Sequence, residues 1–133
     1  MIVVDTNIIS YLYISSEKSE FAEQLLTSDP QWNAPILWRS EFRSVLSLYL
    51  RKNILNFNEI LIILREAEKL MEGNEFEVSS HHTMKLVKSS NCSAYDCEFV
   101  ALAEHLNVPL ITTDKKVLRA FPEVAKPLDA FLG

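Results

Sequence analysis

Short runs of strand type alternate along this chain with longer segments of helical periodicity, and this alternation most constrains the possible folds. The first run, Ile2-Val3-Val4, is continuous and β-branched, as expected of a strand that is buried on both faces. Further extended segments are expected at 32–34, 75–78, 109–112 and 124–128. We therefore predict an α/β fold, a three-layer α/β/α sandwich with a central parallel sheet of four or five strands.

The segments between these strands have the periodicity and the end signals of helices. In chain order, the expected helices begin near residue 7 and cover approximately 17–27, 36–52, 56–73, 80–89, 93–106 and 115–121. Phe21 should belong to the apolar stripe of the second helix, and Pro35 suits the first position of the third. Asn56 begins a capping box, Gly73 can end that helix, and Ser80 should cap the next one.

The composition excludes several functions. Only two glycines occur among 133 residues, so the chain contains neither a Gly-rich phosphate loop nor a dinucleotide-binding fingerprint. We find no secretion signal, and the longest aliphatic run, 60–64, is far too short to span a membrane. No repeat or linker divides the sequence. We therefore expect one cytoplasmic domain over residues 1–133, with Cys92 and Cys97 as reduced thiols and not as a bridge or metal ligands.

Two acidic residues follow strands of the expected sheet. Asp5 comes directly after 2–4, and Asp114 lies two residues beyond 110–112. In open parallel sheets, ligands bind just beyond the carboxyl ends of the strands. Both residues also precede helical segments, so each could be a helix N-cap, and capping is compatible with ligand binding.

Glu41 lies on a helix face that should be buried. That face includes Leu37, Trp38, Val45 and Leu48. A carboxylate buried there needs a partner, because an unpaired buried charge is very costly. An internal salt bridge with Arg39 or Arg43 is the alternative, but both arginines point to other faces of the helix. We therefore favour a role for Glu41 in facing a metal ion.

Asp96 is also an acid at the buried end of a helix. It can close a capping box with Ser93, but its face continues through Val100 and Ala103, which should be core. At ~6 Å and an effective dielectric constant of ~20, each pair of converging carboxylates would repel by about 3 kcal/mol. Such a cluster is stabilised by protonation or by divalent cations, and oxygen ligands favour Mg²⁺ or Mn²⁺ over zinc. These metals serve phosphoryl chemistry, so the acids indicate phosphodiester cleavage.

Four segments resemble the sequence motifs of PIN domains. They are Val4-Asp5-Thr6-Asn7, Pro35 followed by Glu41, the segment 93–103 with its Tyr95-Asp96 pair, and Leu110-Ile111-Thr112-Thr113-Asp114. The resemblance covers essentially the whole chain, in the same order and with typical spacing. It implies that four acids form a metal-binding quartet and that two polar residues support them: Asp5, Glu41, Asp96 and Asp114, with Asn7 and Thr112.

Small PIN domains of this pattern are mostly VapC-like toxins of type II toxin–antitoxin systems. The resemblance therefore implies an Mg²⁺- or Mn²⁺-dependent endoribonuclease that hydrolyses RNA phosphodiester bonds. It also implies a cognate antitoxin as inhibitor, and a homodimer. The net charge of −5 opposes RNA binding by charge alone, so Lys115, Lys116 and Arg119 are candidates for RNA contacts, although a solvated helix face explains them as well.

Two other functions compete with a catalytic toxin, and the histidines and aromatic residues are interpreted separately. A catalytically silent PIN-like module that binds RNA or protein is the main alternative, and the complete acidic set disfavours it. A haloacid-dehalogenase-type phosphatase ranks last, because position 7 is Asn where that motif requires Asp. His81, His82 and His105 have no zinc-site spacing with the cysteines and should be surface or helix-packing residues. Five aromatic residues should lie in the core or at a dimer interface: Tyr11, Tyr13, Trp32, Trp38 and Tyr49.

Overall fold

The computed structural model describes residues 1–131, and their side chains as far as residue 129. A five-stranded sheet forms its centre, with every neighbouring pair of strands parallel, in the order β3-β2-β1-β4-β5. The strands are β1 (Ile2–Val4), β2 (Trp32–Pro35), β3 (Glu75–Phe76), β4 (Leu110–Thr112) and β5 (Ala125–Pro127). The prediction of a parallel sheet of four or five strands is confirmed.

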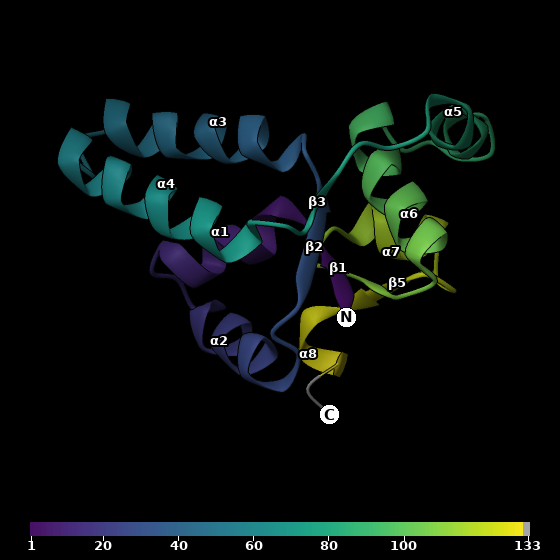
Figure 1. The fold of residues 1–133 in the computed structure, drawn as a ribbon, viewed down its shortest axis with the longest axis horizontal. Helices are drawn as coiled ribbons and strands as arrows, with labels where there is room; N and C mark the ends of the chain where they lie inside the picture. The colour runs from purple at the N-terminus through teal and green to yellow at the C-terminus, as the bar shows by residue number, and fades with distance from the viewer. Residues whose placement is uncertain (132–133) are drawn as a thin grey trace.

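Helices cover both faces of this sheet (Figure 1). The first group, at the left of the view, is α1 (Thr6–Tyr13), α2 (Ser19–Ser28), α3 (Trp38–Arg51) and α4 (Phe57–Met71). The second group, at the right, is α5 (Ser80–Lys88), α6 (Ala94–Leu106) and α7 (Lys115–Ala120). The last helix, α8 (Leu128–Phe131), packs against α2 and β5. The fold is therefore the predicted three-layer α/β/α sandwich.

Strand β1 lies at the centre of the core. Its three residues are buried on both faces, as their β-branched sequence predicts, and Val3 is paired with Asn33 on β2 and with Leu110 on β4. Helix α6 packs across β1, β2 and β4 on one side, and α1 packs on β1 and β4 on the other. The carboxyl end of β1 is thus held between two strands and two helices.

The end signals of α4 and α6 have the expected structural roles. Asn56 and Glu59 form a complete capping box at the start of α4, and Gly73 follows its end with φ +82°. Helix α6 ends at Asn107, which has a left-handed backbone conformation with φ 56°. Cys92 and Cys97 are buried and not bridged. Among the described helices, none is both long and apolar enough to cross a membrane.

Three local predictions were wrong. Pro35 ends β2 instead of starting a helix, because the N–H groups on either side of it, at Ala34 and Ile36, bond to Asn74 and Phe76. Helix α3 consequently begins at Trp38. Ser79, not Ser80, caps α5, and Phe21 is 42% exposed instead of buried.

Candidate active site

Asp5 occupies the carboxyl end of the central strand. Its amide donates to the carbonyl of Ile111, which fixes the backbone against β4, and its carboxylate Oδ2 accepts a hydrogen bond from Thr112 Oγ1 at 2.8 Å. Although Asp5 is at the N-cap position of α1, its side chain makes no capping hydrogen bond. The capping alternative is therefore not realised for this carboxylate, which remains available for another ligand.

Thr112 connects the ends of two neighbouring strands. Its side chain is fully buried, its hydroxyl donates to Asp5, and the same oxygen accepts from the amide of Asp114 at 3.1 Å. One hydroxyl thus sets the direction of the Asp5 side chain and the path of the chain into Asp114. Such fixed partners reduce the reorganisation that a ligand would otherwise require.

Asp114 caps α7 with one of its two carboxylate oxygens. Its Oδ1 accepts from the amides of Lys116 and Val117, at 2.8 Å and 3.2 Å. The capping interpretation is therefore correct for this residue. Because both hydrogen bonds end on Oδ1, Oδ2 is left for a further ligand, so capping does not prevent metal binding.

Glu41 stands at the border of the buried face of α3. The buried residues of that helix are Trp38, Phe42 and Leu46, whereas Leu48 is 53% exposed, so the predicted face was displaced. Glu41 is half-buried, and its Oε1 accepts a hydrogen bond from Thr6 Oγ1 at 2.7 Å. Because Thr6 directly follows Asp5, this hydrogen bond ties Glu41 on α3 to the residue next to Asp5.

Arg39 does not neutralise Glu41. Its guanidinium binds Glu75 with Nε–Oε2 and Nη2–Oε1 distances of 2.6 Å and 2.8 Å, and Glu68 lies 3.4 Å from Nη1. The same Glu75 also accepts from the indole of Trp38 at 2.7 Å, which fixes the start of α3 to β3. The salt-bridge alternative for Glu41 through Arg39 is therefore wrong.

Asp96 lies in the first turn of α6, where its backbone amide donates a hydrogen bond to Ser93 Oγ at 3.0 Å. Val100 and Ala103, further along the same face, are buried as predicted. The Asp96 side chain is half-buried. The sheet edge and the two flanking helices α3 and α6 thus bring all four acids to the same end of the fold.

The carboxylates influence one another's protonation. Burial, reinforced by the charges of Glu41 and Asp96 and opposed by the Thr112 hydrogen bond, raises the pKa of Asp5 to about 6. Burial also raises the pKa of Glu41, with Asp96 adding to the effect. The pKa of Asp96 is raised by burial and further by Asp114. These influences connect all four carboxylates electrostatically.

The donor set fits a hard divalent cation. Within residues 1–131, none of the four carboxylates forms a salt bridge with Lys, Arg or His, and the charge of Lys116 offsets that of Asp96 only in part. Four oxygen-donating groups without a thiolate or imidazole favour Mg²⁺ or Mn²⁺. In the described part of the chain, no three Asp, Glu, His or Cys side chains are gathered closely enough to enclose a metal ion as they stand.

The family follows from comparison with known proteins. Residues 2–126 match the PIN domain family. This chain belongs to the PIN domain family. The PIN domain is 26% identical over 129 residues to Ribonuclease VapC3 of Pyrobaculum aerophilum, covering 95% of this chain and 98% of that protein.

Solved structures share the fold of this PIN domain. The crystal structure of PAE2754 from Pyrobaculum aerophilum has a TM-score of 0.77 and 15% identity, covering 98% of this chain and 92% of that one. A toxin–antitoxin complex from Klebsiella pneumoniae contains a chain with a TM-score of 0.71 and 19% identity, covering 96% of this chain and 98% of that one. At these identities the likeness establishes the three-layer fold.

Three further polar residues lie close to the four acids in sequence or in space. Thr6 donates a hydrogen bond to Glu41, and the sequence analysis did not predict this role. Its position directly after Asp5, at the start of a helix, could have indicated that it lies at the site. Asn7 is exposed, and its supporting role stays a prediction. Lys116 is exposed on α7 and lowers the pKa of Asp96, opposing its burial.

The remaining candidates lie on other surfaces or in the core. Lys115 and Arg119 are exposed on α7, and their contact with RNA stays a prediction. His82 binds Glu104 at 2.7 Å and joins α5 to α6, which confirms the helix-packing interpretation for that histidine. The two tryptophans, Trp32 and Trp38, are fully buried core residues, as expected.

Proposed function

We propose that this PIN domain is an Mg²⁺- or Mn²⁺-dependent endoribonuclease that acts as the toxin of a type II toxin–antitoxin pair. The observation that carries the proposal is the enclosed carboxylate of Asp5 beside Glu41 and Asp96, with its pKa raised to about 6. A carboxylate group in this state gains most from a divalent cation. The similarity to a protein named as a ribonuclease supports RNA as the substrate.

The four acids take different parts in the proposed site. Asp5 and Asp96 are the principal metal ligands, and Glu41 and Asp114 complete the site directly or through water. When bound, the cation lowers the pKa of a water molecule and stabilises the negative charge that develops on the phosphate. Asp114 contributes through Oδ2, since its Oδ1 caps α7.

Two threonines position these ligands. Thr112 holds Oδ2 of Asp5, and Thr6 holds Oε1 of Glu41, so one oxygen of each carboxylate is fixed by a threonine hydroxyl. Fixing the ligand before the reaction removes a reorganisation step and preserves the geometry for in-line attack on a phosphodiester. In the proposed mechanism, neither threonine contacts the reacting atoms.

A single substitution tests the proposal. Asp5→Asn keeps the shape of the side chain and an acceptor for Thr112 but removes the charge, so RNA cleavage in Mg²⁺ or Mn²⁺ should fall by at least about 100-fold. Asp29→Asn is the matched control, because Asp29 pairs with the N-terminal amine and precedes β2, at the opposite edge of the sheet. Cleavage by the Asp5 variant at the wild-type rate would exclude the assignment.

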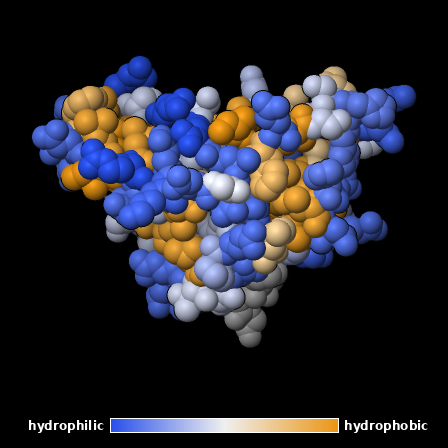
Figure 2. Space-filling model, in the orientation of Figure 1, coloured by the Kyte–Doolittle hydropathy of each residue, from blue (hydrophilic) through white to orange (hydrophobic). Residues whose placement is uncertain are grey.

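The proposal includes a cognate antitoxin, a homodimer and a single domain over 1–133. Exposed apolar side chains gather at the end of the α3–α4 hairpin (Figure 2), and they include Leu48, Ile54, Phe57 and Ile62. Patches of this kind mark protein contacts. Light scattering should therefore give about twice the chain mass of 15.3 kDa, and a monomer would exclude the dimer. The proposal also includes the cytoplasm as the place where the protein acts on RNA.

A further inference from the structure

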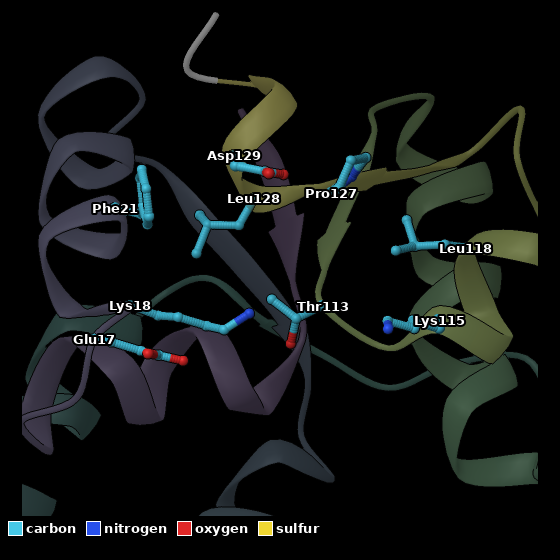
Figure 3. A pocket seen from close by; sticks show the side chains of 9 residues that line it. All are labelled: Glu17, Lys18, Phe21, Thr113, Lys115, Leu118, Pro127, Leu128 and Asp129. Atoms are coloured by element: carbon cyan, nitrogen blue, oxygen red, sulfur yellow. The ribbon is translucent and has the colours of Figure 1, made fainter.

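A cavity of about 430 Å³ opens beside the acidic edge of the sheet (Figure 3). Its walls come from the turn before α2, from α2, α7 and α8, from the loop after β4 and from the end of β5. The residues that matter below are Lys18, Phe21, Thr113, Lys115, Leu118 and Leu128, and we call this space the Phe21 cavity. A volume of this size lies in the range of small-ligand pockets.

The Phe21 cavity adjoins the candidate active site through one short segment of chain. Thr113 and Lys115 line the cavity, and Asp114 lies between them. Thr112, the residue before Thr113, holds Asp5. Since consecutive Cα atoms are about 3.8 Å apart, the cavity begins within one residue of Asp114, and Asp5 is connected to it through Thr112.

One wall of the cavity is apolar and partly open to solvent. Phe21 is 42% exposed although its neighbours on α2, Ala22 and Leu25, are fully buried. Figure 3 shows Phe21 and Leu128 on one side of the cavity and Leu118 on another. An aromatic ring with an open face is the kind of surface on which a nucleic-acid base stacks.

Two lysines face this wall. In Figure 3, Lys18, Thr113 and Lys115 follow one another along the side of the cavity opposite Phe21 and Leu128. The Lys18 ammonium lies 5.9 Å from the ring centre of Tyr11, and the Tyr11 hydroxyl is 3.0 Å from Thr113 Oγ1. The position of the Lys18 ammonium is therefore stabilised by its contact with the Tyr11 ring.

We infer that the Phe21 cavity binds a nucleotide of single-stranded RNA next to the scissile phosphate, an inference that rests on the proposed function. The base lies against Phe21 and the aliphatic wall, and Lys18 and Lys115 contact the adjoining phosphates. The two ammonium groups act locally on the phosphates, because Glu17 and Asp129 also line the cavity and leave it without a net positive charge, and the whole chain has a net charge of −5. Glu17 supplies an acceptor for the amino groups of a base.

Binding without cleavage tests the inference. The full chain is titrated in EDTA against a fluorescein-labelled single-stranded RNA of mixed sequence, followed by fluorescence anisotropy. Phe21→Ala should weaken binding by about tenfold, since stacking on one aromatic side chain contributes on this scale. The double variant Lys18→Gln/Lys115→Gln should bind less tightly and show a smaller dependence on salt concentration.

Matched controls separate the cavity from general effects. Met84→Ala removes an apolar side chain that is 56% exposed on α5, and Lys85→Gln/Lys88→Gln removes two exposed lysines of the same helix. These variants should bind RNA as the unaltered chain does. Thermal melting of every variant shows whether the fold is retained. Cavity variants that bind like their controls would overturn the inference, as would a loss of antitoxin binding without any loss of RNA binding.

The inference and the proposed function can fail separately. If the chain cleaves RNA through Asp5 but the cavity variants keep the wild-type KM, the cavity inference is wrong and the chemistry stands. If the chain cleaves nothing in Mg²⁺ or Mn²⁺ but the cavity variants lose RNA binding, the chemistry is wrong and the RNA subsite stands. Where both hold, the cavity variants should raise KM by about tenfold and leave kcat unchanged.

Discussion

Thr112 is the residue on which the positions of two carboxylates depend. Its hydroxyl bonds to Asp5 and to the amide of Asp114. Thr112→Val should lower kcat/KM by about 10- to 100-fold, the usual effect of removing a partner that orients a metal ligand. Because the Thr112 hydrogen bond lowers the pKa of Asp5, its loss should also move the acidic limb of the pH–rate profile to higher pH.

The buried Thr83 is the matched control for that experiment. It lies on α5, and its hydroxyl donates to the carbonyl of Ser79. Thr83→Val removes a buried hydroxyl of the same type without touching an acid. If both variants lose the same activity, or if the pH profile of the Thr112 variant does not move, Thr112 does not act through Asp5.

The raised pKa of Asp5 also predicts how stability depends on pH. Between the ordinary pKa of 3.8 and the folded-state value of about 6, the folded protein binds more protons than the unfolded chain. Stability of the metal-free protein should therefore fall as the pH rises through this window, by up to about 3 kcal/mol. Asp5→Asn should remove this loss and raise the Tm at pH 7 in EDTA.

Urea unfolding at pH 4.5 and pH 7 measures this effect. Asp29→Asn controls for a general change of charge, because Asp29 makes an ion pair with the N-terminal amine. A fall in the stability of the Asp5 variant at pH 7 would mean that the ionised carboxylate is stabilised by the fold, which contradicts the burial argument.

At the scale of elements, α5 and α6 each begin with a serine N-cap, but only α6 contains one of the four acidic residues of the candidate site. Ser93 caps α6, which carries Asp96, and Ser79 caps α5, which carries none of the four acids. Either Ser→Ala change should reduce the free energy of unfolding by about 1 kcal/mol. Only Ser93→Ala should also reduce cleavage, since Ser93 lowers the pKa of Asp96 and fixes its turn. Equal activities of the two variants would show that the α6 cap has no part in the site.

The elements themselves were predictable where one local signal decides them. The β-branched run 2–4, the Asn56 capping box and Gly73 each act within a few residues, so the sequence was sufficient. Pro35 was misplaced because its position depends on hydrogen bonds to residues about 40 positions away, in and before β3. Helix α8 was missed because it is short and follows Pro127.

The acidic residues were predicted by position, but their partners were not. Asp5 and Asp114 could be placed from the strand ends that precede them. Thr6 and the border position of Glu41 depend on how α1 and α3 pack, and periodicity alone placed the exposed Leu48 on the buried face together with the buried Trp38. The Phe21 cavity combines segments more than 90 residues apart, so no local pattern could indicate it.

For the whole molecule, a bound cation should couple the acidic edge to global stability. A ligand that binds only the folded state at 100 times its Kd contributes about 2.7 kcal/mol, which corresponds to a Tm increase on the order of 10 °C. Mn²⁺ should therefore raise the Tm at pH 7.5 and have much less effect at pH 5, where Asp5 is protonated. Buffer without Mn²⁺ is the first control. The second is the Asp5→Asn variant, whose Tm should not rise when Mn²⁺ is added. An equal response of both proteins would place the cation elsewhere.

The order of the strands has a consequence for biosynthesis. Strand β1 is made first, yet it is paired with Leu110 and Ile111, and Asp5 meets Thr112 across 107 positions of sequence. A ribosome that is still translating the first hundred codons therefore carries a polypeptide in which this edge does not yet exist. Pairing over such a span is slow to form. An RNA-cleaving activity built here would stay silent during most of synthesis and start only when the chain is nearly complete.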